Sequence, residues 1–376
     1  MKILFTGGGS GGHFYPIIAT AEAINDAVRE RKLIEPKLYY AAPEPYDKEM
    51  LIANNITFVP TSAGKMRNYF SILNFFDSFK TAWGIFRSIL RVFFLYPDVV
   101  FGTGGYASFP TLLAAKLFRI PVVIYATDAE PSRVNRWAGK FAEKIAVSYA
   151  SASEFFPKEK VAHTGNPVRK ALLLPAREGS FEFLGFKREI PVLLVVGGSQ
   201  GAQTVNEAIL AALPQLLEKY QVVHQTGEAN LKDVEGRARV ALGNTLLMER
   251  YKAYGYLNDL ATRMAAGAAS MVIARAGSGT IFEIASWGLP SILVPIPEPI
   301  SHDQKKNAFD YARTGACVVI EQNNLTPGLL VSEVDRIMGD EHLKMKMGNA
   351  ARSFSRPDSA KLIADAILDI ALSHEV

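Results

Sequence analysis

The sequence predicts an α/β protein built on parallel sheets, and three features carry this prediction. Strand-length apolar runs alternate with helix-length segments, as in doubly wound sheets. A glycine-rich turn at Gly7–Gly12 separates the first strand from the first helix. The same arrangement returns near the middle of the chain, where Val192–Val196 runs into Gly197–Ala202. Two such strand–glycine turn–helix units, one at the start of each half, predict two doubly wound α/β domains.

Length and composition narrow the protein class. A chain of 376 residues is long enough for two domains, each with a sizeable core. The single cysteine, Cys317, excludes a disulfide framework and suits a reducing compartment. Glycines interrupt the apolar start directly after Phe5 and Thr6, and no apolar run approaches the roughly 18 residues that span a bilayer. We therefore expect a cytoplasmic chain.

The first half shows a clear strand and helix pattern. The predicted strands are Lys37–Ala42, Thr57–Pro60, Val99–Gly102, Val122–Ala126 and Lys144–Ser148, and the predicted helices include Ile17–Arg31 and Thr111–Phe118. A second glycine turn, Gly102–Tyr106, follows one of these strands. Open α/β sheets bind ligands at such strand ends.

The second half begins after a segment, Pro167–Glu189, that we expect to be an irregular linker. The predicted elements after it are a helix at Thr204–Leu217, strands at Met271–Ala274 and Ser291–Pro295, and a last helix at Ser359–Leu372. The last helix follows a break at Pro357, so it could cross back onto the first domain.

The first glycine loop is a candidate anion site. Gly7, Gly9 and Gly12 meet the pattern Gly-x-Gly-x-x-Gly, and the helix start that follows offers free N–H groups. His13, which titrates near neutral pH, lies at its end. One alternative is a simple turn. Another is a nicotinamide-dependent dehydrogenase, which predicts an acidic residue at the end of the second strand. That strand ends at Ala42 and Pro43, with Glu44 only further on.

Several polar residues could hold a sugar nucleotide between two such domains. The loop at Gly197–Gly201 offers N–H groups and the Ser199 hydroxyl to phosphate oxygens. Glu283 could accept hydrogen bonds from both ribose hydroxyls, and Arg169 could neutralise a diphosphate. Gln304 and Asn307 could bind sugar hydroxyls. The chain has no Asp-x-Asp sequence, so we expect backbone dipoles and Arg169 to stabilise a leaving diphosphate without metal.

The segment Tyr69–Tyr96 has an unusual composition. It holds ten aromatic residues, and the basic residues Lys80, Arg87 and Arg91 are interspersed between them. A core-facing helix is the ordinary interpretation of such a stretch. Here the aromatic groups exceed what one helix face can bury, and basic neighbours favour an anionic membrane surface. The cations are too few to favour nucleic acid.

Together these motifs resemble the MurG family, the peptidoglycan N-acetylglucosaminyltransferases that form lipid II. The matching segments run in order through nearly the whole chain. They are Gly9–His13 with Pro16, Gly104–Tyr106, Thr164–Arg169, Gly197–Ala202, Arg275–Gly277 with Glu283, Gly288–Pro290, and Gln304 with Asn307 and Ala308.

The resemblance implies a glycosyltransferase B fold, with two Rossmann-like domains facing across a cleft and a C-terminal helix crossing back to the first. Residues 1–165 with 357–376 would bind acceptor and membrane, and residues 166–356 would bind donor. The implied reaction is an inverting, metal-independent transfer from UDP-N-acetylglucosamine to the muramyl 4-hydroxyl of lipid I, without a cofactor, at the inner face of the cytoplasmic membrane. Alternatives are transfer to a different lipid acceptor, the related epimerases, and an inactive membrane scaffold.

The resemblance also assigns roles to single residues. His13 is the candidate general base, and the segment Tyr69–Tyr96 matches the membrane patch of the family. The implied donor-binding residues are Ser10, Gly11, Gly12, Arg169, Ser199, Leu257, Ser278, Gly279, Thr280, Ile281, Phe282, Glu283 and Gln304.

One segment departs from the family pattern. Where the family usually has His-Glu-Gln-Asn, this chain has Tyr125-Ala126-Thr127-Asp128. An aspartate accepts hydrogen bonds but cannot donate them as an amide does. Asp128 is therefore a candidate substrate contact and a second candidate base, and it could change the acceptor.

Overall fold

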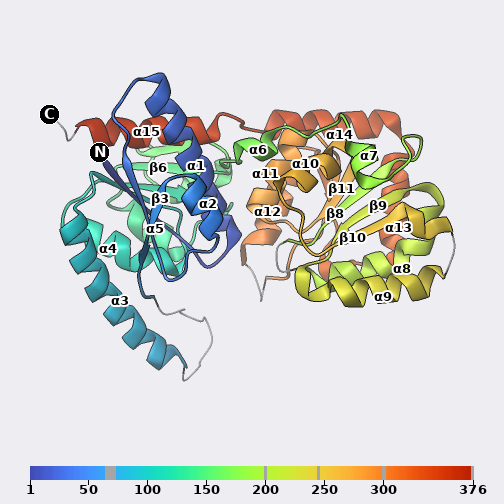
Figure 1. The fold of residues 1–376 in the computed structure, drawn as a ribbon, viewed down its shortest axis with the longest axis horizontal. Helices are drawn as coiled ribbons and strands as arrows, with labels where there is room; N and C mark the ends of the chain where they lie inside the picture. The colour runs from blue at the N-terminus through green and yellow to red at the C-terminus, as the bar shows by residue number, and fades with distance from the viewer. Residues whose placement is uncertain (64–72, 199–200, 244–245, 299–301, 374–376) are drawn as a thin grey trace. The chain divides into compact units, whose positions relative to one another are not determined.

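A computed structural model describes residues 1–63, 73–198, 201–243, 246–298 and 302–373. The chain divides into two units, one formed by Met1–Arg169 with Arg356–Val376 and the other by Lys170–Ser355. Each unit contains one fully parallel sheet (Figure 1). The predicted fold class, two parallel-sheet α/β domains, is confirmed.

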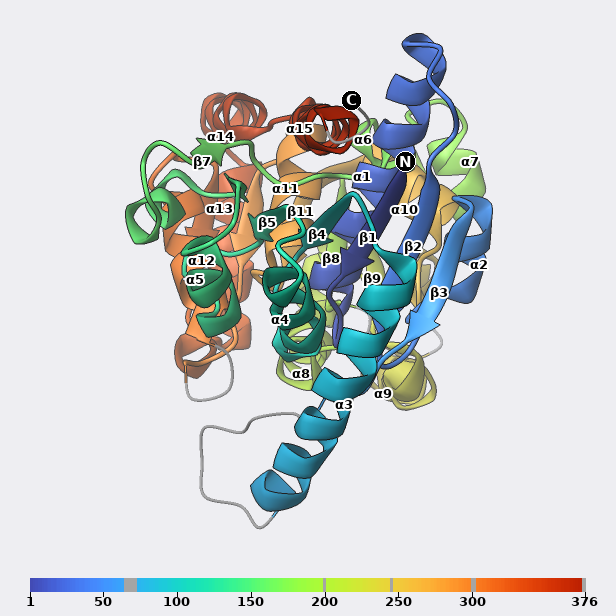
Figure 2. The same ribbon diagram turned by 90° about the vertical axis from the view of Figure 1, so that its left-hand side faces the viewer.

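The sheet of the first unit has seven strands in the order β3-β2-β1-β4-β5-β6-β7 (Figure 2). They are β1 (Lys2–Thr6), β2 (Lys37–Ala42), β3 (Ile56–Pro60), β4 (Val99–Gly102), β5 (Val122–Ala126), β6 (Lys144–Val147) and β7 (Val161–His163). The strand order reverses between β1 and β4. Doubly wound sheets bind ligands at this switch point, beyond the carboxyl ends of the strands.

Helices cover both faces of this first sheet. They are α1 (Gly11–Glu30), α2 (Lys48–Ala53), α3 (Leu73–Leu95), η1 (Tyr106–Ser108), α4 (Phe109–Leu117), α5 (Arg133–Gly139), η2 (Ala150–Phe155) and α15 (Ser359–Ser373). One apolar core joins α1 and α15 to the sheet, with Ile17 and Ile367 fully buried. A second core joins α3, α4 and α5 to the other face. The predicted return of the last helix to the first unit is confirmed.

The second unit has six strands in the order β10-β9-β8-β11-β12-β13. They are β8 (Val192–Val196), β9 (Gln221–Gln225), β10 (Tyr251–Tyr254), β11 (Ala269–Ala274), β12 (Ser291–Leu293) and β13 (Cys317–Val319). The helices are α6 (Lys170–Leu173), α7 (Ser180–Leu184), α8 (Gln203–Lys219), η3 (Glu228–Asn230), α9 (Leu231–Leu242), η4 (Leu246–Arg250), α10 (Asp259–Ala268), α11 (Ser278–Trp287), α12 (His302–Ala312), η5 (Gln322–Asn324), α13 (Pro327–Met338) and α14 (Glu341–Phe354).

Two local predictions are wrong. Helix α1 begins at Gly11 rather than Ile17, because the carbonyl of Ser10 already accepts hydrogen bonds from the amides of His13 and Phe14. His13 therefore stands in the first helical turn. The predicted irregular linker, Pro167–Glu189, contains the short helices α6 and α7, because buried Leu172 and Leu184 anchor them to the second unit.

Candidate functional site

His13 is fixed by the residue that follows strand β4. Its Nδ1 lies 2.9 Å from the carbonyl oxygen of Thr103, and the Thr103 hydroxyl donates a hydrogen bond of 2.9 Å to the His13 carbonyl. A carbonyl oxygen can only accept, so Nδ1 carries the ring proton in neutral His13. The lone pair is then on Nε2, the atom that could remove a proton from a ligand.

The backbone beside the His13 ring has room for glycine alone. Gly105 adopts a φ of 77°, in the left-handed region that glycine favours. A Cβ atom at Gly105 would lie 3.2 Å from both Cδ2 and Nε2 of His13. The glycine turn predicted after β4 therefore leaves Nε2 and Cδ2 of His13 free of a neighbouring side chain at position 105.

The surroundings of His13 tune its basicity. Burial of the half-buried ring lowers the pKa of His13 below 6.5, while the Asp128 carboxylate and the Thr103 carbonyl act in the opposite direction. Asp128 follows β5, the strand that pairs with β4, and its carboxylate accepts a 2.6 Å hydrogen bond from the Thr127 hydroxyl. The net effect keeps the imidazole neutral, as a general base must be, at neutral pH.

Tyr125, at the position of the family's histidine, belongs to the core. Its ring is fully buried, and its hydroxyl donates a 2.5 Å hydrogen bond to Oδ1 of Asn166 and also bonds Ser148. Burial raises the pKa of this phenol well above its usual value. The departure at Tyr125 thus lies in the core, whereas Asp128 lies close enough to His13 to raise the pKa of its imidazole.

The N-terminus of α1 brings together several predicted binding residues. Ser10 and Gly12 are exposed, and Gly11 is half-buried. The first amides of a helix lack intrahelical partners, and the helix dipole adds partial positive charge there. This end of α1 can therefore bind an anion beside His13.

Arg169 ends the first segment, Met1–Arg169, of the first unit, and it is only 6% exposed. Its guanidinium carbon lies 4.3 Å from the centre of the Tyr15 ring, and Nη1 lies 3.7 Å from the sulfur of Met50. Stacking of this kind fixes a cation in place. Arg169 thus carries a positioned charge next to α1.

The remaining predicted donor-binding residues belong to the second unit, and most of them begin helix α11. The Ser278 hydroxyl is buried and has no hydrogen-bond partner among the described residues. Ile281 and Phe282 have buried side chains, so their contribution to a ligand is limited to the main chain. Glu283 is partly exposed on the same helix. The start of α11 is thus a second helix terminus with a polar side chain in need of a partner.

Three predicted donor-binding residues remain: Gln304, Leu257 and Ser199. Oε1 of Gln304 accepts a 3.2 Å hydrogen bond from the amide of Ile296. The Leu257 side chain is 4% exposed, so Leu257 offers a ligand its main chain rather than its side chain. Ser199 falls in the gap at residues 199–200.

Arg275, which sequence reasoning used only as part of a motif, is a structured cation at the end of β11. Its guanidinium donates to the carbonyl of Val294 at 3.1 Å and to Oε1 of Gln322 at 2.8 Å. Burial lowers the pKa of Arg275. Its place at the carboxyl end of a parallel strand is the signal that could have identified it.

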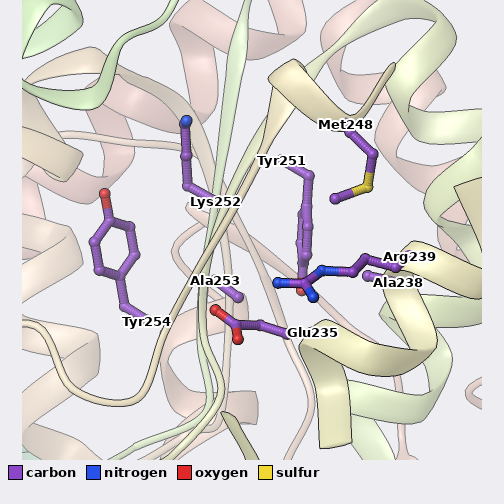
Figure 3. Close-up of a pocket in the computed structure, with 8 residues that line it drawn as sticks. All are labelled: Glu235, Ala238, Arg239, Met248, Tyr251, Lys252, Ala253 and Tyr254. Atoms are coloured by element: carbon purple, nitrogen blue, oxygen red, sulfur yellow. The ribbon is translucent and has the colours of Figure 1, made fainter. Parts of the chain in front are cut away.

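A cavity of about 210 Å³ lies between α9 and the edge strand β10, and none of the predicted site residues lines it (Figure 3). Its lining residues are Glu235, Ala238, Arg239, Met248, Tyr251, Lys252, Ala253 and Tyr254. On the neighbouring strand β9, the buried His224 is hydrogen-bonded to the Tyr251 hydroxyl at 2.9 Å and to Oδ1 of Asn206 at 3.0 Å.

Helix α3 buries small residues and exposes large ones. Gly84, Ser88 and Val92 are buried, whereas five apolar side chains on its other faces are exposed. Those five are Trp83, Phe86, Leu90, Phe93 and Phe94. One face of α3 does pack in the core through Val92, as the core-facing interpretation predicts, but the five large side chains lie outside that face. Tyr69 and Phe70 lie outside the described residues. Across the described ranges, no helix is long and apolar enough to cross a membrane.

Family models and similar proteins of known name assign this chain to the same family. The N-terminal domain model of glycosyltransferase family 28 matches residues 3–147, and the C-terminal domain model matches residues 192–363. Two similar proteins are UDP-N-acetylglucosamine–N-acetylmuramyl-(pentapeptide) pyrophosphoryl-undecaprenol N-acetylglucosamine transferases. The one from Bacillus thuringiensis (strain Al Hakam) is 35% identical over 337 residues, covering 89% of this chain and 91% of its own. The one from Legionella pneumophila (strain Paris) is 37% identical over 339 residues, covering 90% and 89%.

A solved structure agrees in fold. The crystal structure of MurG from Acinetobacter baumannii matches with a TM-score of 0.74 and 24% identity, covering 98% of this chain and 99% of its own. With identities of 35% and 37% over about nine-tenths of the chain, the family is determined. The chain belongs to the MurG family of N-acetylglucosamine transferases.

Proposed function

We propose that this protein transfers N-acetylglucosamine from UDP-N-acetylglucosamine to the muramyl 4-hydroxyl of lipid I, forming lipid II for peptidoglycan synthesis. The observation that carries the proposal is the 37% identity, over nine-tenths of both chains, with a transferase of that name. The geometry of His13 supports it, because a neutral imidazole with a free Nε2 beside a helix N-terminus suits base-assisted attack by a hydroxyl near a diphosphate.

In the proposed mechanism, Nε2 of His13 accepts the proton of the acceptor hydroxyl. The oxygen attacks the anomeric carbon of the donor sugar from the face opposite UDP. The bond between that carbon and the UDP oxygen breaks, UDP leaves with the electron pair, and the configuration inverts. General-base assistance of this kind contributes about 10²–10⁴-fold to the rate.

We assign donor binding mainly to the second unit. The amides at the start of α11, with the Ser278 hydroxyl, would bind phosphate oxygens, and Glu283 would accept hydrogen bonds from the ribose. The main chain at Leu257 would contact uracil. The further proposed donor contacts are Arg169, Ser199, Gly279, Thr280, Ile281, Phe282 and Gln304, whereas Ser10, Gly11 and Gly12 at the start of α1 would bind a substrate diphosphate. The second unit, Lys170–Ser355, would thus form the donor domain, and the first unit, Met1–Arg169 with Arg356–Val376, the acceptor domain.

Asp128 supports a narrower proposal about the acceptor. Its carboxylate influences the pKa of His13, so it belongs to the same site. We propose that it contacts the acceptor and assists His13. Because a carboxylate cannot donate as an amide does, a related lipid acceptor is the second candidate substrate.

We propose that the protein works at the cytoplasmic side of the cell membrane as a peripheral protein. The exposed aromatic face of α3 is the supporting observation, with Arg87 and Arg91 on the same helix. Aromatic side chains at the headgroup level combined with basic neighbours favour anionic lipid.

The decisive experiment measures UDP release from UDP-N-acetylglucosamine with a lipid I analogue in EDTA, against a control without acceptor. We expect acceptor-dependent UDP release without added metal. If donor binds but no sugar is transferred, the acceptor assignment is wrong, and other lipid alcohols become the substrates to test. If donor does not bind, the transferase proposal is wrong.

A further inference from the structure

Tyr46, in the loop after strand β2, combines an unusual backbone with an exposed ring. Its φ is 53°, in the left-handed region that a tyrosine rarely adopts. Its side chain is 42% exposed. Proline at position 45 precedes it, and Asp47 follows it as the cap of α2, accepting a 3.0 Å hydrogen bond from the amide of Met50. A strained backbone conformation of this kind is kept only where surrounding contacts stabilise it, and such conformations are common at functional sites.

The ring of Tyr46 is held against the start of α1. Its centre lies 5.0 Å from that of Phe14 and 5.8 Å from that of Tyr15. A Cβ atom at Gly11 would lie 2.8 Å from both the Tyr46 hydroxyl and the Tyr15 ring. The absence of a side chain at Gly11 therefore lets both rings approach the helix terminus. With Arg169 stacked on Tyr15, they form a rigid aromatic wall beside a fixed positive charge.

The strand order places this wall on the side of α1 opposite His13. The carboxyl ends of parallel strands all lie on the same side of the sheet, and five neighbouring strands end there in the order β3-β2-β1-β4-β5 (Figure 2). His13 contacts Thr103, after β4, on one side of the α1 terminus. Tyr46, after β2, lies on the other side. β3 is the next strand beyond β2, and Ser62, just after β3, lies against Gly84 of α3.

A lipid-linked sugar diphosphate has its parts in the corresponding order. The attacked hydroxyl is on the sugar, the diphosphate follows the sugar, and the apolar chain follows the diphosphate. With the hydroxyl at Nε2 of His13 and the diphosphate over the start of α1, the apolar chain begins at Tyr46. From Tyr46, the apolar chain would pass the carboxyl ends of β2 and β3 toward the exposed aromatic side chains of α3.

We propose that Tyr46, backed by Tyr15, is the contact surface for the first isoprene units of the acceptor, and that it directs the polyprenyl chain toward α3. This inference rests on the proposed function. It makes Tyr46 a specificity-determining residue for the lipid part of the acceptor, with no role in donor binding or in proton transfer.

The test compares two lipid I analogues, one with a farnesyl chain on the diphosphate and one with a methyl group, both in detergent solution. Tyr46→Gly is the main variant, because glycine accepts the positive φ without strain and the fold is preserved. We expect the KM for the farnesyl acceptor to rise about fivefold to tenfold, as for the loss of one apolar contact. The KM values for the methyl acceptor and for the donor should stay unchanged.

Two further variants make the result specific. Tyr46→Phe keeps the apolar ring and should retain the KM of the parent protein for the farnesyl acceptor. Phe183→Ala removes an aromatic side chain of similar exposure, 46%, from α7 of the second unit and should have no effect. An equal rise in KM for both acceptors, or no rise for either, overturns the inference while the transferase function stands. Failure of the parent protein to release UDP with either acceptor overturns the proposed function itself.

Discussion

His13 and Thr103, ninety residues apart in the chain, hold each other through two hydrogen bonds of 2.9 Å. One runs from Nδ1 of the imidazole to the Thr103 carbonyl, and the other from the Thr103 hydroxyl to the His13 carbonyl. The pair joins the first turn of α1 to the end of β4. It therefore fixes both the position of the ring and the nitrogen that carries the lone pair.

Replacing His13 with alanine should lower kcat by about 10²–10⁴-fold. The variant lacks the base but leaves the donor contacts of the second unit unchanged, so the KM for UDP-N-acetylglucosamine should change little. Steady-state kinetics with both substrates varied will separate the two effects. His163→Ala, a histidine on the edge strand β7, is the matched control and should keep normal turnover. Normal turnover in the His13 variant would move the base role to Asp128.

The pH dependence of kcat/KM should report the environment of His13. The base must be neutral, so activity falls as pH drops through its pKa, which burial lowers from 6.5. The Asp128 carboxylate favours the charged imidazolium and raises that pKa. Asp128→Asn should therefore move the acid limb of the profile to lower pH.

The matched control for this profile is Glu130→Gln. Glu130 is the next carboxylate along the chain, and it pairs with Arg136 at 2.6 Å. Glu130→Gln should therefore leave the acid limb in place. An acid limb that stays fixed in Asp128→Asn would mean that Asp128 does not act on His13.

The exposed face of α3 should govern membrane binding. Combining Trp83→Ala with Phe94→Ala removes rings that are 56% and 79% exposed, so the fold loses little packing. Binding to vesicles containing phosphatidylglycerol should weaken at least tenfold, since each ring contributes about 1–2 kcal/mol at the interface. Sedimentation with vesicles measures this. Ile34→Ala, at an apolar residue that is 87% exposed after α1, should bind like the parent protein. Equal binding by both variants would place the membrane contact elsewhere.

Gly84 should be needed for the docking of α3. A Cβ atom there would lie 1.6 Å from the carbonyl oxygen of Ser62, which is backbone and cannot move aside easily. Gly84→Ala should lower the free energy of unfolding of the first unit by about 1–3 kcal/mol. In contrast, Gly236→Ala, in the interior of α9 with open space around it, should stabilise the second unit by about 0.5–1 kcal/mol. Chemical denaturation checks both signs, and a neutral Gly84→Ala would show that α3 is free to shift.

His224 should make the second unit sensitive to acid. Burial lowers the pKa of His224 to about 3, whereas an unfolded histidine titrates near 6.5. Between these values the unfolded state binds the extra proton, so the stability that neutral His224 provides falls as pH drops from about 6.5 toward 3. His224→Gln should be less stable at pH 7, through loss of the bonds to Tyr251 and Asn206, but should lose less stability on acidification. Urea midpoints at about pH 7 and pH 5 would reveal it, and parallel losses in both proteins would contradict it.

The sequence by itself determined the architecture of this protein. Strands such as Val99–Gly102 and Val122–Ala126 have the predicted bounds, because apolar runs and the glycine turns after them are local signals. The return of the last helix to the first unit was also predictable from the break at Pro357. The family motifs are also short and local. They indicated the MurG family, and the sequence identity with known transferases confirmed it.

Only the tertiary structure decided which face each residue presents. It buried Tyr125 with Ser148 and Asn166, chose Nε2 as the free nitrogen of His13, and turned the small residues of α3 inward. It also placed Tyr46 against Gly11. Each outcome depends on contacts between segments far apart in the chain. Local sequence patterns carry no information about such contacts, because packing, burial and charge act only once the sheet has brought the segments together.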